Sequence, residues 1–390
     1  MSNIFNRPIL AAKMAAQLLR PGVLDEGLRS GLLLSGVRRT GKTTFLMQDL
    51  VPALEKLGAL VVYVDLWSDA LASPATLVNA AVRKTLAELQ TPSSNLLKRL
   101  NRLSGVDAEA FGFKFGFKLD SIGASGGTTL AQAFTEVVDH SKTDLVLIID
   151  EVQHAIATEE GKNMLLALKA AREAINSRAS TPGHFIFIGA GSHRAQVSEL
   201  RVGRKQAFEG AISVDYPLLD GDYVAHLLQR LSQEGIVTLP SPAIALEAFR
   251  MLGNRPEEML RALRQLTHSL PVGGKPDDYL TVIAATLRST AADIEFRKIE
   301  ELGELAKVVF DWIVNNLGET RGVYSKDAAA IYSAAIRREV SVEELQPIIN
   351  NLLDANLIMR KSHGVYGVTD PYFQELWKAK KALEGDEFSS

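Results

Sequence analysis

Short, mostly apolar runs alternate with longer amphipathic segments in the first part of the chain. The runs have the length of strands, and the segments between them carry apolar residues at the 3.6-residue period of helices. The runs are Leu32–Leu34, Ala59–Leu66, Leu145–Ile149, His184–Gly189 and Ile212–Tyr216. Because an apolar run without polar alternation is typical of a strand covered on both faces, the pattern predicts an α/β fold with a buried parallel sheet.

From Asp220 onward the pattern is helical. Amphipathic segments ahead of the break at Pro271–Pro276 predict a small helical lid over residues 219–275. The segments after the break predict a linker helix, three shorter helices and a two-stranded wing, which is the layout of a winged helix-turn-helix over residues 276–390. Residues 1–218 are left for the α/β core.

One stretch of the core, residues 91–127, does not follow the pattern and is predicted to be an insertion. Within it, Phe111–Leu119 alternates four phenylalanines with glycine and lysine, which predicts a strand with all rings on one face and both lysines on the other. Such a ribbon could contact single-stranded nucleic acid or a neighbouring subunit, or its rings could cover the flank of the domain. The second interpretation is favoured, because phenylalanine is usually buried.

The composition excludes several classes of protein. The 390 residues include no cysteine, which rules out a disulfide scaffold, a thiolate zinc site and a cysteine nucleophile. The N-terminal stretch has the form of neither a signal peptide nor a membrane span, so we expect a cytoplasmic protein without membrane contact. The net charge of −3 indicates no general attraction to nucleic acid, so such binding would need a local basic patch.

The clearest motif lies directly after the first apolar run. The octet GVRRTGKT satisfies the pattern G-x-x-x-x-G-K-[ST] of a phosphate-binding loop, and an amphipathic helix follows it. Its glycines let backbone N–H groups close around a triphosphate, and the helix points its positive end at the anion. Lys42 would reach the β- and γ-phosphates, and Thr43 would offer its hydroxyl to Mg²⁺. The predicted nucleotide-binding residues are Gly36, Val37, Arg38, Arg39, Thr40, Gly41, Lys42, Thr43 and Thr44. A chance glycine-rich turn is disfavoured by the flanking strand and helix.

Two acidic residues follow the third apolar run, about a hundred residues after the loop. Asp150 and Glu151 stand at the carboxyl end of a buried strand, where phosphate-loop proteins hold Mg²⁺. Asp150 is the predicted metal carboxylate. Glu151 is the predicted catalytic base, which orients and deprotonates the water that attacks the γ-phosphate.

Three further side chains are candidates near the nucleotide. Ser192 follows the fourth run and could hydrogen-bond the attacking water or the γ-phosphate, with His193 in reserve. Arg204 could project from one subunit into the nucleotide of a neighbour as a charge-stabilising finger, or simply be solvated. Arg255 is a cation of the predicted lid that could contact the nucleotide or lie at the surface.

The charge balance of the predicted winged helix opposes simple docking on DNA. Residues 300–390 hold ten lysines and arginines against fifteen acidic residues, and the third helix opens with two glutamates. Contact with phosphates would have to come from Arg360, Lys361 and His363 in the wing. The module is therefore predicted to bind either DNA, through this wing, or a protein.

Taken together, the phosphate loop, the acidic strand end, the polar strand end and the helical lid resemble an AAA+ ATPase. The pair GVRRTGKTT and LIIDEVQH is similar to archaeal-type ATPases of the STAND and origin-recognition-like branch, which often carry a C-terminal winged helix. The resemblance implies a P-loop NTPase three-layer sandwich with a parallel sheet of strand order 5-1-4-3-2. It also implies ATP and Mg²⁺ as ligands and assembly into homo-oligomers in which hydrolysis switches a bound partner.

These features lead to two hypotheses of function. The first is an ATP-hydrolysing molecular switch that acts on DNA or on a DNA-bound complex, as in replication, transposition or phage defence. The second is a nucleotide-gated scaffold whose winged helix binds a protein effector. A small-molecule kinase fits poorly, because it would not need Glu151 after the metal-binding aspartate.

Overall fold

The computed structural model describes residues 4–104, 112–200, 207–316 and 320–387 and divides into two compact units. The first, called here the α/β unit, comprises Asn6–Gly36 and Lys42–Tyr216. The second, called here the helical unit, comprises Met1–Phe5, Val37–Gly41 and Pro217–Ser390. The chain therefore passes from one unit to the other twice within the phosphate loop.

The α/β unit is built on a five-stranded sheet in the order β2-β3-β4-β1-β5, and all neighbouring strands are parallel. The strands are β1 Leu32–Ser35, β2 Leu60–Asp65, β3 Leu145–Asp150, β4 Phe185–Gly191 and β5 Ile212–Asp215. Read from the other edge, this is the order 5-1-4-3-2. The predicted strand order and the P-loop NTPase fold are therefore confirmed.

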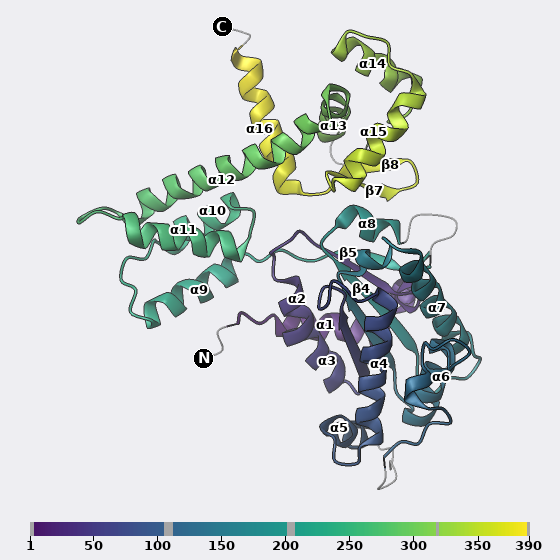
Figure 1. The fold of residues 1–390 in the computed structure, drawn as a ribbon. Coiled ribbons are helices and arrows are strands. Elements are labelled where there is room, and N and C mark those ends of the chain that lie inside the picture. Colours follow the sequence, from purple (N-terminus) through teal and green to yellow (C-terminus); the bar gives the residue numbers. More distant parts are fainter. Residues whose placement is uncertain (1–3, 105–111, 201–206, 317–319, 388–390) are drawn as a thin grey trace. The chain divides into compact units, whose positions relative to one another are not determined.

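Helices cover both faces of this sheet, as Figure 1 shows. Successive residues of β3 enter opposite cores: Leu147 packs on the side of α4, α6 and α7, and Val146 packs on the side of α1 and α3. Because each strand is buried on both sides, its sequence is an unbroken apolar run. The helices of this unit are α1 Pro8–Leu19, α2 Lys42–Phe45, α3 Val51–Lys56, α4 Pro74–Gln90, α5 Asn95–Ser104, α6 Leu130–Ser141, α7 Glu159–Asn176 and α8 Arg194–Glu199; a π-helical turn Leu46–Leu50 joins α2 to α3, and short 3-10 turns lie at Val23–Ser30, Leu119–Ser121 and Val152–Ala155.

The helical unit begins with helices that share one apolar core. They are α9 Gly221–Gln233, α10 Pro242–Met251, α11 Pro256–Ser269 and α12 Pro276–Glu301. The chain continues through α13 Glu304–Asn315, β6 Thr320–Arg321, α14 Lys326–Ile336, α15 Val342–Asp354, β7 Ile358–Ser362, β8 Val365–Val368 and α16 Pro371–Glu387. The three strands form an antiparallel sheet in the order β6-β8-β7. The helical segments predicted after Asp220 are thus confirmed, whereas β6 and α16 were not predicted.

Aromatic rings join α12, α13 and α16 inside the helical unit. The ring of Trp377 lies edge-on against Phe296 and Phe310, with centroids 5.6 and 5.1 Å away. Its indole N–H donates to the Asp311 carboxylate at 2.8 Å, so the buried polar end of the ring is satisfied. No described helix combines the length and the apolar character needed to cross a membrane.

Local capping explains where several helices start. The side chain of Ser73 accepts a hydrogen bond from the Thr76 N–H at the start of α4, as its position in the sequence predicts. At the start of α15, Ser341 and Glu344 form a capping box, in which each side chain binds the backbone N–H of the other residue. These polar contacts fix the ends of helices whose apolar faces then pack.

The predicted strand over Phe111–Leu119 is wrong. Residues 112–118 form no strand, and Phe111 lies outside the described residues. The backbone of this segment docks on the end of α4, where the Phe113 N–H donates to the Leu89 carbonyl at 3.1 Å, and so it does not lie along a sheet edge. The rings nevertheless half-bury against the core while the lysines between them are exposed, as the favoured interpretation expected.

We predict that Phe187→Ala destabilises the α/β unit by about 3–5 kcal/mol, because it empties a large volume from a close-packed core. Phe187 lies in β4, is fully buried and stacks on Phe208 with a centroid separation of 3.9 Å. Urea unfolding measures the change. Leu71→Ala is the control, since Leu71 is 99% exposed and its truncation should alter stability by less than about 0.5 kcal/mol. Equal effects in the two variants would contradict the assigned core.

Candidate nucleotide-binding site

The phosphate loop leads from the end of β1 to the start of α2. Gly36 lies so close to β5 that a Cβ atom added there would be 3.0 Å from the Cβ of Tyr216. Its N–H donates to the Gly191 carbonyl of β4 at 3.2 Å, which ties the loop to the neighbouring strand. At the other end of the loop, Gly41 has φ +87°, a conformation that favours glycine. Glycine is therefore favoured at the two motif positions for different steric reasons: a close neighbour at Gly36 and a positive φ at Gly41.

The middle of the loop, Val37–Gly41, belongs to the helical unit. The Thr40 hydroxyl donates to the Val37 carbonyl at 2.8 Å and so closes the turn. Arg39, which has φ +67°, lies 3.1 Å from Glu257 at the start of α11. Both of these side chains are mostly exposed, so their ion pair adds little stability. Arg38 is also exposed, as are Thr43 and Thr44 in the first turn of α2.

The α/β unit buries one ammonium group beside two carboxylates. Lys42, the first residue of α2, places its Nζ 3.7 Å from Asp150 Oδ1 and 3.9 Å from Glu151 Oε1. All three side chains are buried, and Asp150 is 0% exposed. A buried carboxylate is costly unless a cation or hydrogen bonds compensate it. The cation of the phosphate loop therefore also holds the acidic end of β3 in place.

Two hydroxyl groups converge on the carboxylate of Asp150. The Thr43 hydroxyl donates to Asp150 Oδ2 at 2.6 Å, and the phenol of Tyr63 in β2 donates to the same oxygen at 3.2 Å. Burial and the charge of Asp150 raise the pKa of Tyr63, so the phenol keeps its proton and remains a donor. Mg²⁺ binds proteins through one or two carboxylates or hydroxyls and completes its shell with phosphate and water oxygens. The adjacent oxygens of Thr43 and Asp150 fit this requirement.

Glu151 is held against the end of β4. Its backbone is left-handed, with φ +54°, which is uncommon for a residue other than glycine. The side-chain amide of Gln153 and the hydroxyl of Ser192, at 2.9 Å, both donate to Glu151 Oε2. Burial alone would raise the pKa of Glu151, but these hydrogen bonds and the charge of Lys42 outweigh it, so the pKa lies below its usual range. Glu151 is therefore ionised at neutral pH, with its carboxylate free of a proton.

Gln153 and Tyr63 are site residues that the sequence analysis missed. Tyr63 belongs to an apolar run, and only the pairing of β2 with β3 brings it beside Asp150. Gln153 reaches Glu151 because Gly191 leaves room: a Cβ atom at Gly191 would lie 2.2 Å from the Gln153 side-chain oxygen. The sequence shows a glycine at the end of β4, which indicates a close approach there, but it does not show that Gln153 is the residue that approaches.

The remaining candidates lie outside this cluster or outside the described residues. Arg204 falls among residues 201–206, which the structure does not describe. Arg255, at the start of α11, lies 2.7 Å from the Asp370 carboxylate and over the ring of Tyr372, with its guanidinium carbon 5.4 Å from the ring centroid. Both of these contacts lie within the helical unit.

Comparison with known proteins supports the interpretation of this geometry. Residues 26–197, which contain the phosphate loop, Asp150, Glu151 and Ser192, match the family model of the AAA domain. This part of the chain is therefore similar to an AAA domain. Members of that family bind nucleotide and generally hydrolyse ATP with Mg²⁺.

Solved structures agree with this assignment at the level of the fold. A Walker-type ATPase of Pyrococcus abyssi superposes with a TM-score of 0.50 at 14% identity, over 94% of this chain and 95% of that one. The ORC2 protein of Aeropyrum pernix, in its ADP form, superposes with a TM-score of 0.50 at 13% identity, over 97% of both chains. The sequence matches no curated protein. At such identities the likeness concerns the fold and not the activity.

We predict that Lys42→Ala lowers ATP affinity by about 100-fold, because the phosphates lose a buried charge-assisted donor. Isothermal titration with ATP and Mg²⁺ measures the change. Lys162→Ala, which removes an exposed lysine of α7, should leave the affinity unchanged. Since Lys42 also compensates two buried carboxylates, circular dichroism must show that the variant is folded. Unchanged affinity in folded Lys42→Ala would contradict the site.

Proposed function

We propose that this protein is an ATP-hydrolysing AAA+ molecular switch that acts on DNA or on a DNA-bound complex. One observation carries the enzymatic part of the proposal: Lys42, Asp150 and Glu151 meet at one end of the sheet, and Thr43 and Ser192 hydrogen-bond the two carboxylates. A nucleotide-binding site needs only the loop and its lysine. A buried, ionised glutamate beside the metal-binding aspartate is the additional feature that hydrolysis requires.

Each side chain has a proposed role. The loop N–H groups of residues 36–44 and the Lys42 ammonium would bind the phosphates. Thr43 and Asp150 would hold Mg²⁺, which when bound would supply positive charge to the phosphate oxygens. Glu151 orients the attacking water and takes its proton. Ser192 and Gln153 keep the Glu151 carboxylate in position. Arg204 is proposed as a finger toward a neighbouring subunit, and Arg255 as a lid residue near the nucleotide.

We predict that Glu151→Gln lowers the ATPase kcat by about 100-fold or more and leaves ATP affinity nearly unchanged, because the amide cannot accept the proton of water. A phosphate-release assay measures turnover, and calorimetry measures affinity. Glu173→Gln is the matched control, since Glu173 lies on the exposed face of α7 and its loss should not alter turnover. Full turnover in Glu151→Gln would refute the assignment of the base.

The part of the proposal that concerns DNA rests on the C-terminal half of the helical unit. Its order α13-β6-α14-α15-β7-β8, with β7 and β8 forming a hairpin, supports a winged helix-turn-helix. The hairpin exposes Lys361, near the end of β7, and His363, in its turn, which favours contact with phosphates at the wing. The first turn of α15 instead carries Glu343 and Glu344, which opposes insertion of that helix into a DNA groove.

If the wing contacts DNA, Lys361→Gln should weaken binding to duplexes of any sequence and lower the slope of log K against log salt by about 0.9, because one fewer counterion is released. Fluorescence anisotropy over a salt series measures both. Lys298→Gln, which removes a lysine of α12 paired with Glu295, is the control and should leave the slope unchanged. An unaltered slope in Lys361→Gln would remove the wing from the proposal.

The second candidate is a nucleotide-gated scaffold whose winged helix binds a protein effector. The acidic excess of residues 300–390 favours it. DNA that leaves ATPase activity unchanged at low salt, together with a stable complex between the chain and a co-purifying protein, would favour the scaffold over the switch.

A further inference from the structure

A second polar cavity lies at the opposite edge of the sheet in the α/β unit. It has a volume of about 380 Å³, within the range of sites for small ligands. Residues just ahead of three strands line it: Gly58 before β2, Asp144 before β3 and His184 before β4. Because the strands are parallel, this edge is the one away from Asp150, which ends β3. The cavity is therefore separate from the nucleotide site.

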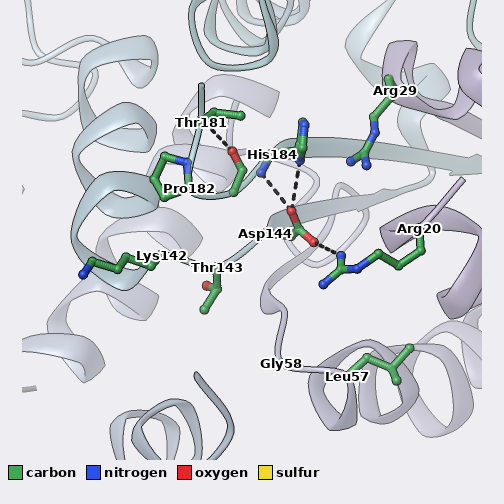
Figure 2. A pocket seen from close by; sticks show the side chains of 11 residues that line it. Arg20, Arg29, Leu57, Gly58, Lys142, Thr143, Asp144, Thr181, Pro182 and His184 are labelled. Carbon is green, nitrogen blue, oxygen red and sulfur yellow. Dashed lines mark hydrogen bonds and ion pairs between the residues drawn. The ribbon is translucent and has the colours of Figure 1, made fainter. Parts of the chain in front are cut away.

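Positive charge exceeds negative charge around this cavity. Arg20, Arg29 and Lys142 line it, and Asp144 is the single carboxylate among its described lining residues. Figure 2 shows Arg20, Arg29 and His184 converging on Asp144, with Lys142 lying apart from them. Asp144 is already engaged, since it accepts from Arg20 at 3.0 Å and from the His184 backbone N–H at 2.8 Å. Its hydrogen bonds thus go to Arg20 and His184, and its single charge is shared among several cations.

Arg29 is the cation with the least compensation. Its Nη1 is buried and has no hydrogen-bond partner among the described residues. Its Nη2 reaches only the Leu19 carbonyl, at 3.5 Å, and that oxygen also accepts from Arg20 at 2.8 Å. Burial lowers the pKa of Arg29, the charge of Asp144 raises it and that of Arg20 lowers it again; the net direction is downward, so Asp144 offsets only part of the cost of burying this cation. A buried guanidinium donor without an acceptor is costly and calls for a partner.

We propose that this cavity binds a phosphate group, carried by a small ligand or present as free phosphate, with Arg29 as its main donor. Arginine presents a planar set of N–H groups that matches phosphate oxygens. The cavity exceeds the size of a single oxyanion, so it has room for the remainder of a small phosphorylated molecule. The proposal is independent of nucleotide hydrolysis.

His184 supplies a local reporter of such binding. Burial and the charges of Arg29 and Arg20 lower the pKa of His184. The carboxylate of Asp144, 3.4 Å from the imidazole, raises the pKa by less, so the pKa lies below its usual value and the ring is neutral at pH 7. Lys142 is the other charged group that lines the cavity. A bound phosphate would favour the imidazolium and raise the pKa of His184. Binding and protonation are therefore coupled, and bound phosphate should shift the His184 titration to higher pH.

The test follows the imidazole NMR signals of the full chain during titration with inorganic phosphate and, separately, with ribose 5-phosphate. His184→Gln identifies the relevant signal among the seven histidines. In the wild type, both probes should raise the pKa of His184. Arg29→Gln should weaken the affinity for both probes, measured from this signal, by about tenfold or more, because a charge-assisted donor is lost. Arg264→Gln, which changes an exposed arginine of α11, is the matched control and should respond as the wild type does.

The titrations distinguish free phosphate from a phosphorylated ligand, and failure of this proposal from failure of the proposed function. Tighter binding of ribose 5-phosphate would indicate a phosphorylated ligand, and equal binding would indicate phosphate alone. Lys142→Gln, an exposed position, provides a second variant with a smaller expected loss if Arg29→Gln does not fold. No change of the His184 signal with either probe, or equal responses in the wild type and the folded cavity variants, would overturn the proposal. Because His184 reports only on this cavity, that result would leave the nucleotide site untouched.

Discussion

The carboxyl end of the central sheet depends on one buried ammonium group, that of Lys42, which compensates two carboxylates at once. Lys42 lies within 4 Å of both Asp150 and Glu151, and these side chains are buried at the end of the central strands. Two carboxylates at this depth would repel each other and lose hydration, which is tolerable only with a cation beside them. The same cation is the one the phosphate loop offers to an anion. Binding of phosphate would therefore redistribute a charge on which the local fold relies, and this links the occupancy of the site to the position of Glu151.

The topology of the sheet makes this arrangement possible. Strand β1 lies between β4 and β5, and β3 lies on the other side of β4, so the loop after β1 and the acids after β3 flank the end of β4. Ser192 follows that strand and reaches Glu151. In a parallel sheet all carboxyl ends meet at one edge, so residues distant in sequence come together without any long-range signal in the sequence itself.

The two edges of the sheet have opposite chemistry. At the carboxyl edge, Asp150 and Glu151 outnumber the single lysine, which suits a divalent cation carried by a triphosphate. At the amino edge, Arg20 and Arg29 outnumber Asp144, which suits an anion without a metal. Unbalanced charge, buried at the carboxyl edge and partly buried at Arg29 of the amino edge, gives both edges a physical reason to bind a ligand of complementary charge.

The sequence alone was sufficient for the strands of the parallel sheet, for most of the helices and for the phosphate loop, because these features are local. Apolar runs without alternation predict strands buried on two faces, and glycine with lysine at fixed spacing predicts a turn around phosphate. The strand order was implied by the resemblance to AAA+ ATPases, and the structure confirms it. Only the tertiary structure decided the contacts that depend on which elements become neighbours. Tyr63 joins Asp150 through strand pairing, Gln153 reaches Glu151 across a glycine, and Phe113 docks on the end of α4 where a strand was predicted. Arg20, Arg29 and His184 come from three separate segments, and their shared cavity exists only because those segments meet at one edge of the folded sheet.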